Sequence, residues 1–149
     1  MTSTHAKLLY HVVFSTKHRV PYVIPDVRDK LYPYIEGIVR HQHGNVIEIG
    51  GMPDHVHILL QLAPHVPVSK LLQHIKGSSS RWLQEQHILR DRFAWQRGYG
   101  AFSVSESNIA RVQLYIQRQE EHHKKESFAS ELIRLLRKHR IAFEGDPSS

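Results

Sequence analysis

Apolar residues follow two different periods along the chain, one typical of β-strands and the other of α-helices. Residues 7–16 are rich in β-branched and aromatic side chains, and residues 54–62 alternate between polar and apolar positions. Both patterns are typical of strands. Residues 45–50 alternate in the same way, and the short link to 54–62 is rich in glycine and proline, which predicts a hairpin. A fourth strand, interrupted by two glycines, is expected over residues 93–104.

Helical spacing of apolar residues predicts four helices. They are expected over about residues 25–43, 68–86, 105–123 and 128–139, the last within an amphipathic C-terminal segment of about 127–143. The order strand, helix, strand, strand, helix, strand, helix, helix is typical of an α+β, ferredoxin-like (RRM-like) fold with additional C-terminal helices. In this fold two helices cover one face of an antiparallel sheet. We expect the other face to be available and to carry the function.

The 149 residues are expected to form one domain, 1–149. The longest apolar runs are far too short to span a bilayer, and no stretch near residue 1 resembles a secretory signal, so a cytoplasmic location is expected. The chain has no cysteine. Disulfides and thiolate metal sites are therefore excluded, and any metal must be held by imidazole, carboxylate or amide oxygen.

The chain is basic, with 20 Lys and Arg against 14 Asp and Glu and a formal net charge of +6. An excess of this size favours a polyanionic partner such as DNA, because each phosphate contact releases counterions. Many small basic proteins have no such partner, however. The function must therefore be sought in particular residues.

Two histidines share one face of the predicted strand 54–62. Strand alternation places His55 and His57 together, whereas Val56 and Ile58 point toward the helices. Two imidazoles at this spacing can converge on one metal ion. The pair also occurs in zinc hydrolases, and two partly exposed histidines without any metal are a common alternative. Glu48 has the same parity on the neighbouring strand and is a candidate to accept a ring N–H and orient a ligand from the second shell.

The predicted helix 105–123 carries a second group of polar residues. Tyr115 and Gln119 are four residues apart, hence on one face, and His122 and His123 follow one turn later. A tyrosine beside an apolar stripe is commonly a core-edge residue, and a glutamine there is commonly exposed. Combined with the histidine pair, however, the amide oxygen of Gln119 would complete a site that leaves positions open for phosphate oxygens. Such a site suits Mg²⁺ or Mn²⁺.

The chain resembles the single-tyrosine transposases of the HUH superfamily. Two motifs carry the resemblance, MPDHVHIL at 52–59 and YIQRQEEHH at 115–123, and it extends to HVVF at 11–14, KGSSS at 76–80 and WQRGYGAF at 95–102. It therefore covers nearly the whole chain. The tyrosine transposases associated with repetitive palindromes (REP) are close relatives in the same superfamily.

This resemblance implies a role for each residue of the two motifs. His55 and His57 would be ligands of a divalent metal, Gln119 the third ligand, and Tyr115 the nucleophile. The substrates would be single-stranded DNA ends that carry small hairpins. Members of the family act as homodimers, and in several the tyrosine helix reaches the histidine pair of the other subunit.

The chemistry explains why such an enzyme uses a tyrosine. A phenol has a pKa near 10 and needs a divalent ion on the scissile phosphate to orient its attack and stabilise the departing 3′-oxygen. The product is a 5′-phosphotyrosine, which a second 3′-hydroxyl can displace without ATP. Cutting and joining become one reversible transesterification.

Further candidates are weaker. His123 is a candidate for the second shell of the metal. Residues that are candidates for DNA contact by charge or base stacking are Lys76, Ser78, Arg81, Trp95, Arg97 and Tyr99. For the aromatic members the common alternative is a place in the core, and for the basic ones a solvated helix face.

Two other functions are compatible with parts of the pattern. Ferredoxin-like sheets bind single-stranded nucleic acid without catalysis, which would require neither metal nor Tyr115. A metal-dependent hydrolase would use the histidine pair with water as nucleophile, and would never retain DNA on the protein.

Overall fold

The computed structural model describes residues 3–87, 89 and 92–149. Its elements, in chain order, are β1 (Leu8–Ser15), η1 (Lys17–Arg19), α1 (Pro25–His41), β2 (Gly44–Met52), β3 (His55–Leu62), α2 (Val68–Glu85), β4 (Gly100–Val104), η2 (Glu106–Asn108), α3 (Ile109–Gln117), α4 (Gln119–His122) and α5 (Phe128–Lys138). In the described part of the chain, no helix combines the length and the apolar composition that a membrane span requires.

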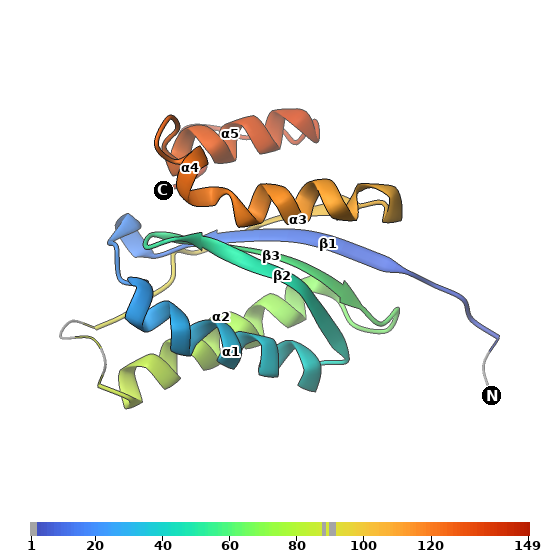
Figure 1. The fold of residues 1–149 in the computed structure, drawn as a ribbon, viewed down its shortest axis with the longest axis horizontal. Helices are drawn as coiled ribbons and strands as arrows, with labels where there is room; N and C mark the ends of the chain where they lie inside the picture. The colour runs from blue at the N-terminus through green and yellow to red at the C-terminus, as the bar shows by residue number, and fades with distance from the viewer. Residues whose placement is uncertain (1–2, 88, 90–91) are drawn as a thin grey trace.

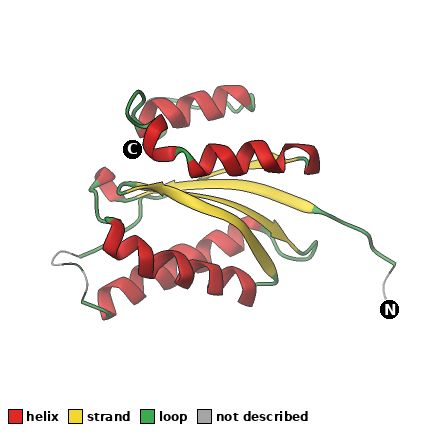
Figure 2. Ribbon diagram, viewed as in Figure 1, coloured by secondary structure: helices red, strands yellow, loops and turns green. Residues whose placement is uncertain are grey.

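One four-stranded sheet forms the centre of the molecule, in the order β2-β3-β1-β4. All neighbouring strands are antiparallel, and β3 lies between β1 and β2. Helices α1 and α2 lie together on one side of the sheet (Figures 1 and 2). The predicted α+β, ferredoxin-like fold is therefore confirmed.

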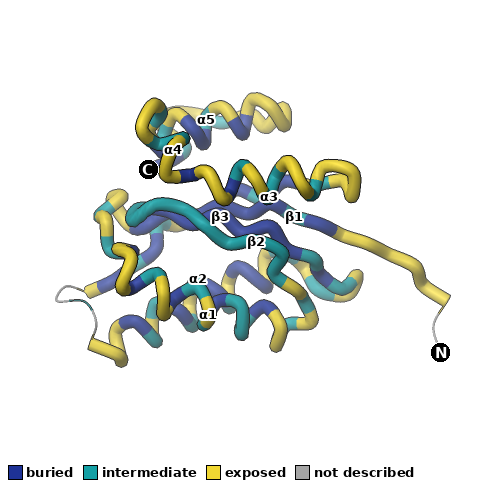
Figure 3. Tube along the Cα trace, in the orientation of Figure 1, coloured by how far each residue is buried: buried dark blue, intermediate teal, exposed yellow. Residues whose placement is uncertain are grey.

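The alternation of side chains along the central strands divides them between the two faces. Val12, Phe14, Val56 and Ile58 are buried against α1 and α2 and form the main core with apolar residues of those helices. Strands β1 and β3 are buried over most of their length, whereas the edge strand β2 is less covered (Figure 3). The side chains at the alternate positions, including His55 and His57, therefore face the opposite layer.

That opposite layer is filled by the chain's own C-terminal helices, so the expectation of an available sheet face is wrong. Helices α3, α4 and α5 lie above the sheet, on the side away from α1 and α2 (Figure 1). Phe128, Leu132 and Leu135 of α5 form a second apolar cluster with Val13 and Phe102 of the sheet. This cluster holds α5 over the strand positions that carry polar residues.

The fourth strand is shorter than expected. It begins at Gly100, and the preceding residues 93–99 form a segment in which Trp95 makes an isolated bridge to Thr16. Phe93 and Trp95 are buried in the main core, and the indole N–H of Trp95 donates to Ser79 Oγ at 2.9 Å. Aromatic composition predicted a strand here because a buried loop and a strand look alike in a short apolar segment.

The helix expected over 105–123 consists of three pieces. η2 and α3 are followed by a break at Arg118, whose φ of −98° and ψ of 19° lie outside the helical range, and α4 starts again at Gln119. The backbone N–H of His123 then bonds to the carbonyl of Gln119 at 2.9 Å. This short turn directs Gln119 and His123 toward the sheet.

Candidate active site

The two histidines of β3 project into the layer between the sheet and the C-terminal helices. His55 is 1% exposed and His57 is fully buried. Because β3 has a hydrogen-bonded strand on each side, the backbone that carries both rings is held at a fixed position. The two histidines are therefore carried by a strand that is paired on both sides.

Donor atoms from three separate elements and one turn converge around these two rings. They are Nε2 of His55, His57 and His123, and Oε1 of Gln119 and Glu131. His55 Nε2 lies 3.0 Å from Gln119 Oε1, and His57 Nε2 lies 3.0 Å from Glu131 Oε1. His123 Nε2 lies 3.0 Å from both of these oxygens. Ligand atoms of the three histidines and Glu131 all fall within 4.8 Å of one another.

His55 is held between acceptors on both ring nitrogens. Its Nδ1 donates to Asp54 Oδ1 at 2.7 Å, and its Nε2 donates to Gln119 Oε1. Burial alone would lower the pKa of His55, but the hydrogen bonds to Asp54 and to Glu131 outweigh burial and raise it to about 9. Without a metal, His55 is therefore an imidazolium at neutral pH.

His57 is neutral and is oriented by a third histidine. His11 Nε2 donates to His57 Nδ1 at 2.8 Å, while His57 Nε2 donates to Glu131. Burial lowers the pKa of His57 to about 4, and burial and the neighbouring His57 lower that of His11 to about 3. Metal binding at Nε2 of His57 requires the other neutral tautomer, in which Nδ1 donates to His11 Nε2 and Nε2 carries no hydrogen.

Glu131 is the central acidic group of the site. Its side chain is fully buried, and one oxygen receives hydrogen bonds from His57 and His123. The other oxygen receives the amide N–H of Gln119 at 2.9 Å. Burial opposes the charged form, but these hydrogen bonds hold the pKa of Glu131 well below its usual range. Glu131 is therefore a carboxylate.

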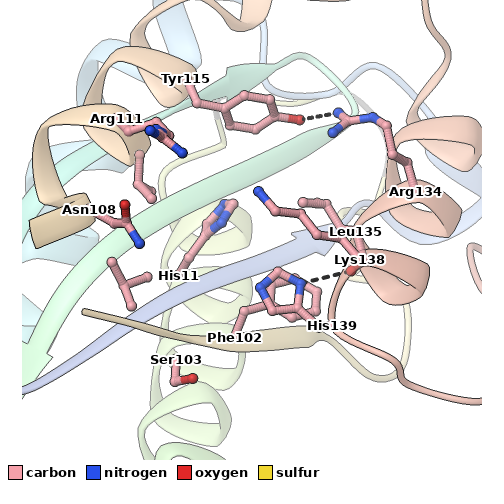
Figure 4. A pocket seen from close by; sticks show the side chains of 12 residues that line it. His11, Phe102, Ser103, Asn108, Arg111, Tyr115, Arg134, Leu135, Lys138 and His139 are labelled. Carbon is pink, nitrogen blue, oxygen red and sulfur yellow. Dashed lines mark hydrogen bonds between the residues drawn. The ribbon is translucent and has the colours of Figure 1, made fainter.

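The hydroxyl of Tyr115 reaches the same carboxylate. It donates to Glu131 Oε2, and Arg134 donates to the phenol oxygen at 2.8 Å (Figure 4). Burial and the Glu131 charge raise the pKa of Tyr115, whereas Arg134 opposes this. The phenol, Glu131 and the histidines thus form one connected network.

The donor set fits a divalent cation. Separations of 3.0 Å between donors are those of neighbouring ligands around one ion with bonds of about 2.1 Å. Three imidazoles, a carboxylate and an amide oxygen are a mixed nitrogen and oxygen set of the kind that first-row divalent metals accept. His55 and His57 also have partners at Nδ1, which leaves Nε2 of each to face the ion.

The structure brings together most of the residues that the sequence proposed for catalysis and metal binding. His55, His57, Gln119 and His123 share the donor cluster, with Tyr115 adjoining it through Glu131. His123 was expected in the second shell of the metal, but its Nε2 atom itself lies among the donor atoms.

Glu48, expected to orient a histidine, lies elsewhere. It accepts from Gln117 Nε2 at 2.9 Å, and Asp54 is the carboxylate that bonds to His55.

Glu131 was missed by the sequence reasoning, although a signal for it exists. Along α5, Phe128, Leu132 and Leu135 recur at helical spacing, and Glu131 lies within this apolar stripe. A carboxylate that a helix buries needs partners, and the histidines supply them. His11 gave a weaker signal, a histidine on the same strand face as the buried Val13.

The residues proposed for DNA contact are not part of this cluster. The side chains of Lys76 and Arg81 extend from α2, on the far face of the sheet, and Lys76 Nζ donates to the carbonyls of Gln96 and Gly98 at 2.6 and 2.7 Å. Trp95 belongs to the core, so its expected role in base stacking is wrong.

The remaining three candidates stay on or near the surface. Arg97 and Tyr99 are exposed, and Ser78 is half-buried on α2.

Asp54→Asn tests the orientation of His55. We expect the affinity for Mn²⁺ to fall by about 10- to 100-fold, because the hydrogen bond that fixes the ring weakens while every ligand remains. Isothermal titration calorimetry measures this affinity. Asp29→Asn, an exposed carboxylate on α1, provides the control; equal affinities for the two variants would contradict the role of Asp54.

Gly50 sets how closely the tyrosine helix approaches the sheet. A Cβ there would lie 2.9 Å from the backbone oxygen and 2.9 Å from Cγ2 of Ile116, next to Tyr115. We expect Gly50→Ala to lower the free energy of unfolding by about 1–3 kcal/mol through overpacking. In Gly77→Ala the added Cβ meets nothing within 4 Å, and this helix substitution should stabilise by about 0.5–1 kcal/mol. Urea denaturation measures the free energy of unfolding of both variants. If both substitutions changed it in the same direction, the tight contact at Gly50 would be contradicted.

Comparison with known proteins gives consistent matches. The family model described as "Transposase IS200 like" matches residues 4–119. The ISDra2 transposase TnpA of Deinococcus radiodurans is 31% identical over 118 residues, covering 76% of this chain and 84% of the relative. The transposase for insertion sequence element IS200 of Salmonella typhimurium is 32% identical over 120 residues, covering 77% of this chain and 78% of the relative.

Two solved structures share the fold. A crystal structure from Deinococcus radiodurans, described as that of a transposase, has a TM-score of 0.66 at 27% identity and covers 80% of this chain and 95% of its own. A REP-associated tyrosine transposase bound to a REP hairpin has a TM-score of 0.62 at 14% identity, covering 83% and 74%. The matched residues 4–119 include His55, His57, Tyr115 and Gln119, whereas His123, Glu131 and Arg134 lie beyond them.

Proposed function

Because the chain belongs to the IS200-like transposase family, we propose that it cleaves and rejoins single-stranded DNA by transesterification through a 5′-phosphotyrosine at Tyr115. Membership confirms the resemblance to single-tyrosine transposases of the HUH superfamily. The observation that carries the proposal is the hydrogen bond of the Tyr115 hydroxyl to Glu131, whose other oxygen bonds to His57. A nucleophile and a candidate metal site thus share one carboxylate.

The proposed metal ligands are the Nε2 atoms of His55, His57 and His123 with oxygens of Gln119 and Glu131. Of Mg²⁺ and Mn²⁺, we favour Mn²⁺, because Mg²⁺ strongly prefers oxygen ligands. When bound, the cation supplies charge neutralisation for the scissile phosphate and for the departing 3′-oxygen.

The protein's own residues perform the rest of the reaction. The phenol oxygen of Tyr115 forms a bond to phosphorus while the bond from phosphorus to the 3′-oxygen breaks. The Tyr115 hydroxyl passes its proton to Glu131 Oε2, which already accepts it in a hydrogen bond, and the 3′-oxygen takes up a proton from solvent, so the strand ends in a 3′-hydroxyl. Arg134 donates to the phenol oxygen and stabilises its negative charge as the proton leaves. Attack by another 3′-hydroxyl reverses these steps and reseals the strand.

The likeness to transposases suggests partners and assembly for this chain. We propose single-stranded DNA with subterminal hairpins as substrate and a homodimer as the working form. In the structure Tyr115 adjoins the histidines of its own chain, an arrangement that would give an active site built in cis. An exchange of tyrosine helices between subunits would produce the same site from two chains.

The experiment that tests this function follows a covalent product. The protein is incubated with labelled single-stranded DNA from the two flanks of its coding sequence, with Mn²⁺ or with EDTA. We expect a metal-dependent protein–DNA band that resists denaturation, and mass spectrometry should place the nucleotide on the peptide that contains Tyr115. Free cleaved DNA without the band would favour a hydrolase. Bound but unaltered DNA would favour a non-catalytic binding module.

A further inference from the structure

A cavity of about 290 Å³ opens beside the Tyr115 hydroxyl. Its walls come from β4, α3 and α5, and His11 of β1 lies at its base (Figure 4). The lining residues Arg134, Leu135 and Lys138 belong to α5 and His139 directly follows it, so this part of the wall lies beyond residue 119, where the match to the family ends. The cavity is therefore formed partly by a segment outside the family's shared region.

Two helices each contribute a positively charged side chain to the lining of the cavity. Arg111 of α3 and Lys138 of α5 point toward the same space from opposite sides (Figure 4). No carboxylate lines the cavity in the part of the chain that the structure describes. Among described residues, neither of these two cations forms an ion pair. Two cations without an acidic partner favour an anionic ligand.

The remaining wall is flat and largely apolar. Phe102 of β4 and His139 are stacked, with ring centroids 4.3 Å apart and an angle of 23° between the planes. Leu135 and Val112 line the same space. His139 is the exposed member of this pair, and an exposed ring beside a cationic rim is a typical surface for a nucleotide, because a base stacks on the ring while its phosphate contacts the cations.

We propose that this cavity holds one nucleotide of the DNA strand, next to the phosphate that Tyr115 attacks. Arg111 and Lys138 contact the phosphate of that nucleotide, and its base packs against the exposed ring of His139, which Phe102 supports from the other side. This subsite rests on the proposed transposase function. It adds a contact that helix α5 supplies directly beside the nucleophile.

The first measurement uses the smallest probes. Amide and imidazole NMR resonances of the Tyr115→Phe protein are followed during titration with thymidine 5′-monophosphate, with thymidine and with inorganic phosphate. We expect the monophosphate to shift resonances of Arg111, Lys138 and His139, and to bind at least fivefold more tightly than either fragment. Equal binding of inorganic phosphate would overturn the nucleotide site.

The second measurement uses oligo(dT) of 15 nucleotides and fluorescence anisotropy at several salt concentrations, without metal. Loss of one phosphate contact to single-stranded DNA should reduce the salt slope of log Kd by about 0.7. We expect this for Arg111→Gln and for Lys138→Gln, with an increase in Kd of at least threefold. Arg137→Gln, an exposed residue next to Lys138 that does not line the cavity, is the matched control.

The outcomes separate this subsite from the proposed function. Variants of Arg111 and Lys138 that behave like Arg137→Gln would overturn the subsite, even if covalent joining by the wild type occurs. Nucleotide binding that depends on both cations, in a protein that never forms the covalent product, would preserve the subsite as a binding site and overturn its place next to the attacked phosphate.

Discussion

Tyr115→Phe is expected to abolish covalent joining of the protein to DNA, with a loss of roughly 10⁴- to 10⁶-fold, the range found when a nucleophile is removed from a hydrolase. The substitution removes one oxygen and leaves the ring in place. Glu131 keeps its hydrogen bonds from His57, His123 and Gln119, so the buried carboxylate remains satisfied. Fold and metal affinity should therefore persist.

The measurement is the yield of denaturation-resistant protein–DNA complex in the presence of Mn²⁺. Tyr34→Phe is the matched control, because this tyrosine lies on α1, on the side of the sheet away from the donor cluster, and loses the same single oxygen. Anisotropy with oligo(dT) should give similar Kd values for wild type and Tyr115→Phe. A substantial yield from Tyr115→Phe would mean that another residue is the nucleophile.

The fold could be predicted from the sequence because its signals are local. Alternation in residues 54–62 separated His55 and His57 from the apolar residues that pack on α1 and α2, and the structure has that same division. The segment 93–99 was assigned wrongly because Phe93 and Trp95 are buried in the main core without the pairing of a regular strand. The amino-acid composition of a segment indicates that it is buried, but it does not indicate whether its backbone pairs with a neighbouring strand.

The site could be predicted only where its residues are neighbours in sequence. His55 and His57 share a strand, and Tyr115 and Gln119 are one turn apart, so each pair is recognisable by spacing. Glu131 reaches them only because the apolar face of α5 packs on Val13 and Phe102. No spacing rule predicts that α5 packs on the sheet. For the same reason, the sequence led to the expectation that this face of the sheet is uncovered.

Helix α5 has two consequences for the site. It supplies Glu131 to the donor cluster and Arg134 to the phenol, and it also buries the histidines almost completely. In the proposed reaction, the scissile phosphate lies between Tyr115 and the proposed metal ligands. Entry of DNA therefore requires a shift of α5 or of the Glu131 side chain, and the apolar contacts of α5 with the sheet set the free energy of that shift.

Glu131→Gln is expected to remove most of the stabilisation that Mn²⁺ gives the protein. For the wild type, Mn²⁺ at 100 times its Kd should add about 2.7 kcal/mol to the free energy of unfolding. For a chain of this length, that corresponds to a rise in Tm of about 5–10 °C. In the variant a neutral amide replaces the fully buried carboxylate among the donors, and the charge that attracts the cation is lost.

The comparison is made within each protein, as Tm with Mn²⁺ minus Tm with EDTA, so any change in the stability of the metal-free variant cancels. We expect a difference below about 2 °C for Glu131→Gln at the Mn²⁺ concentration that saturates the wild type, which corresponds to under 1 kcal/mol. Glu121→Gln, an exposed carboxylate on α4, should keep the full rise. An undiminished rise in Glu131→Gln would show that the histidines and Gln119 bind the cation without α5, and Glu131 would then be only a hydrogen-bond acceptor for the histidine rings in the metal-free protein.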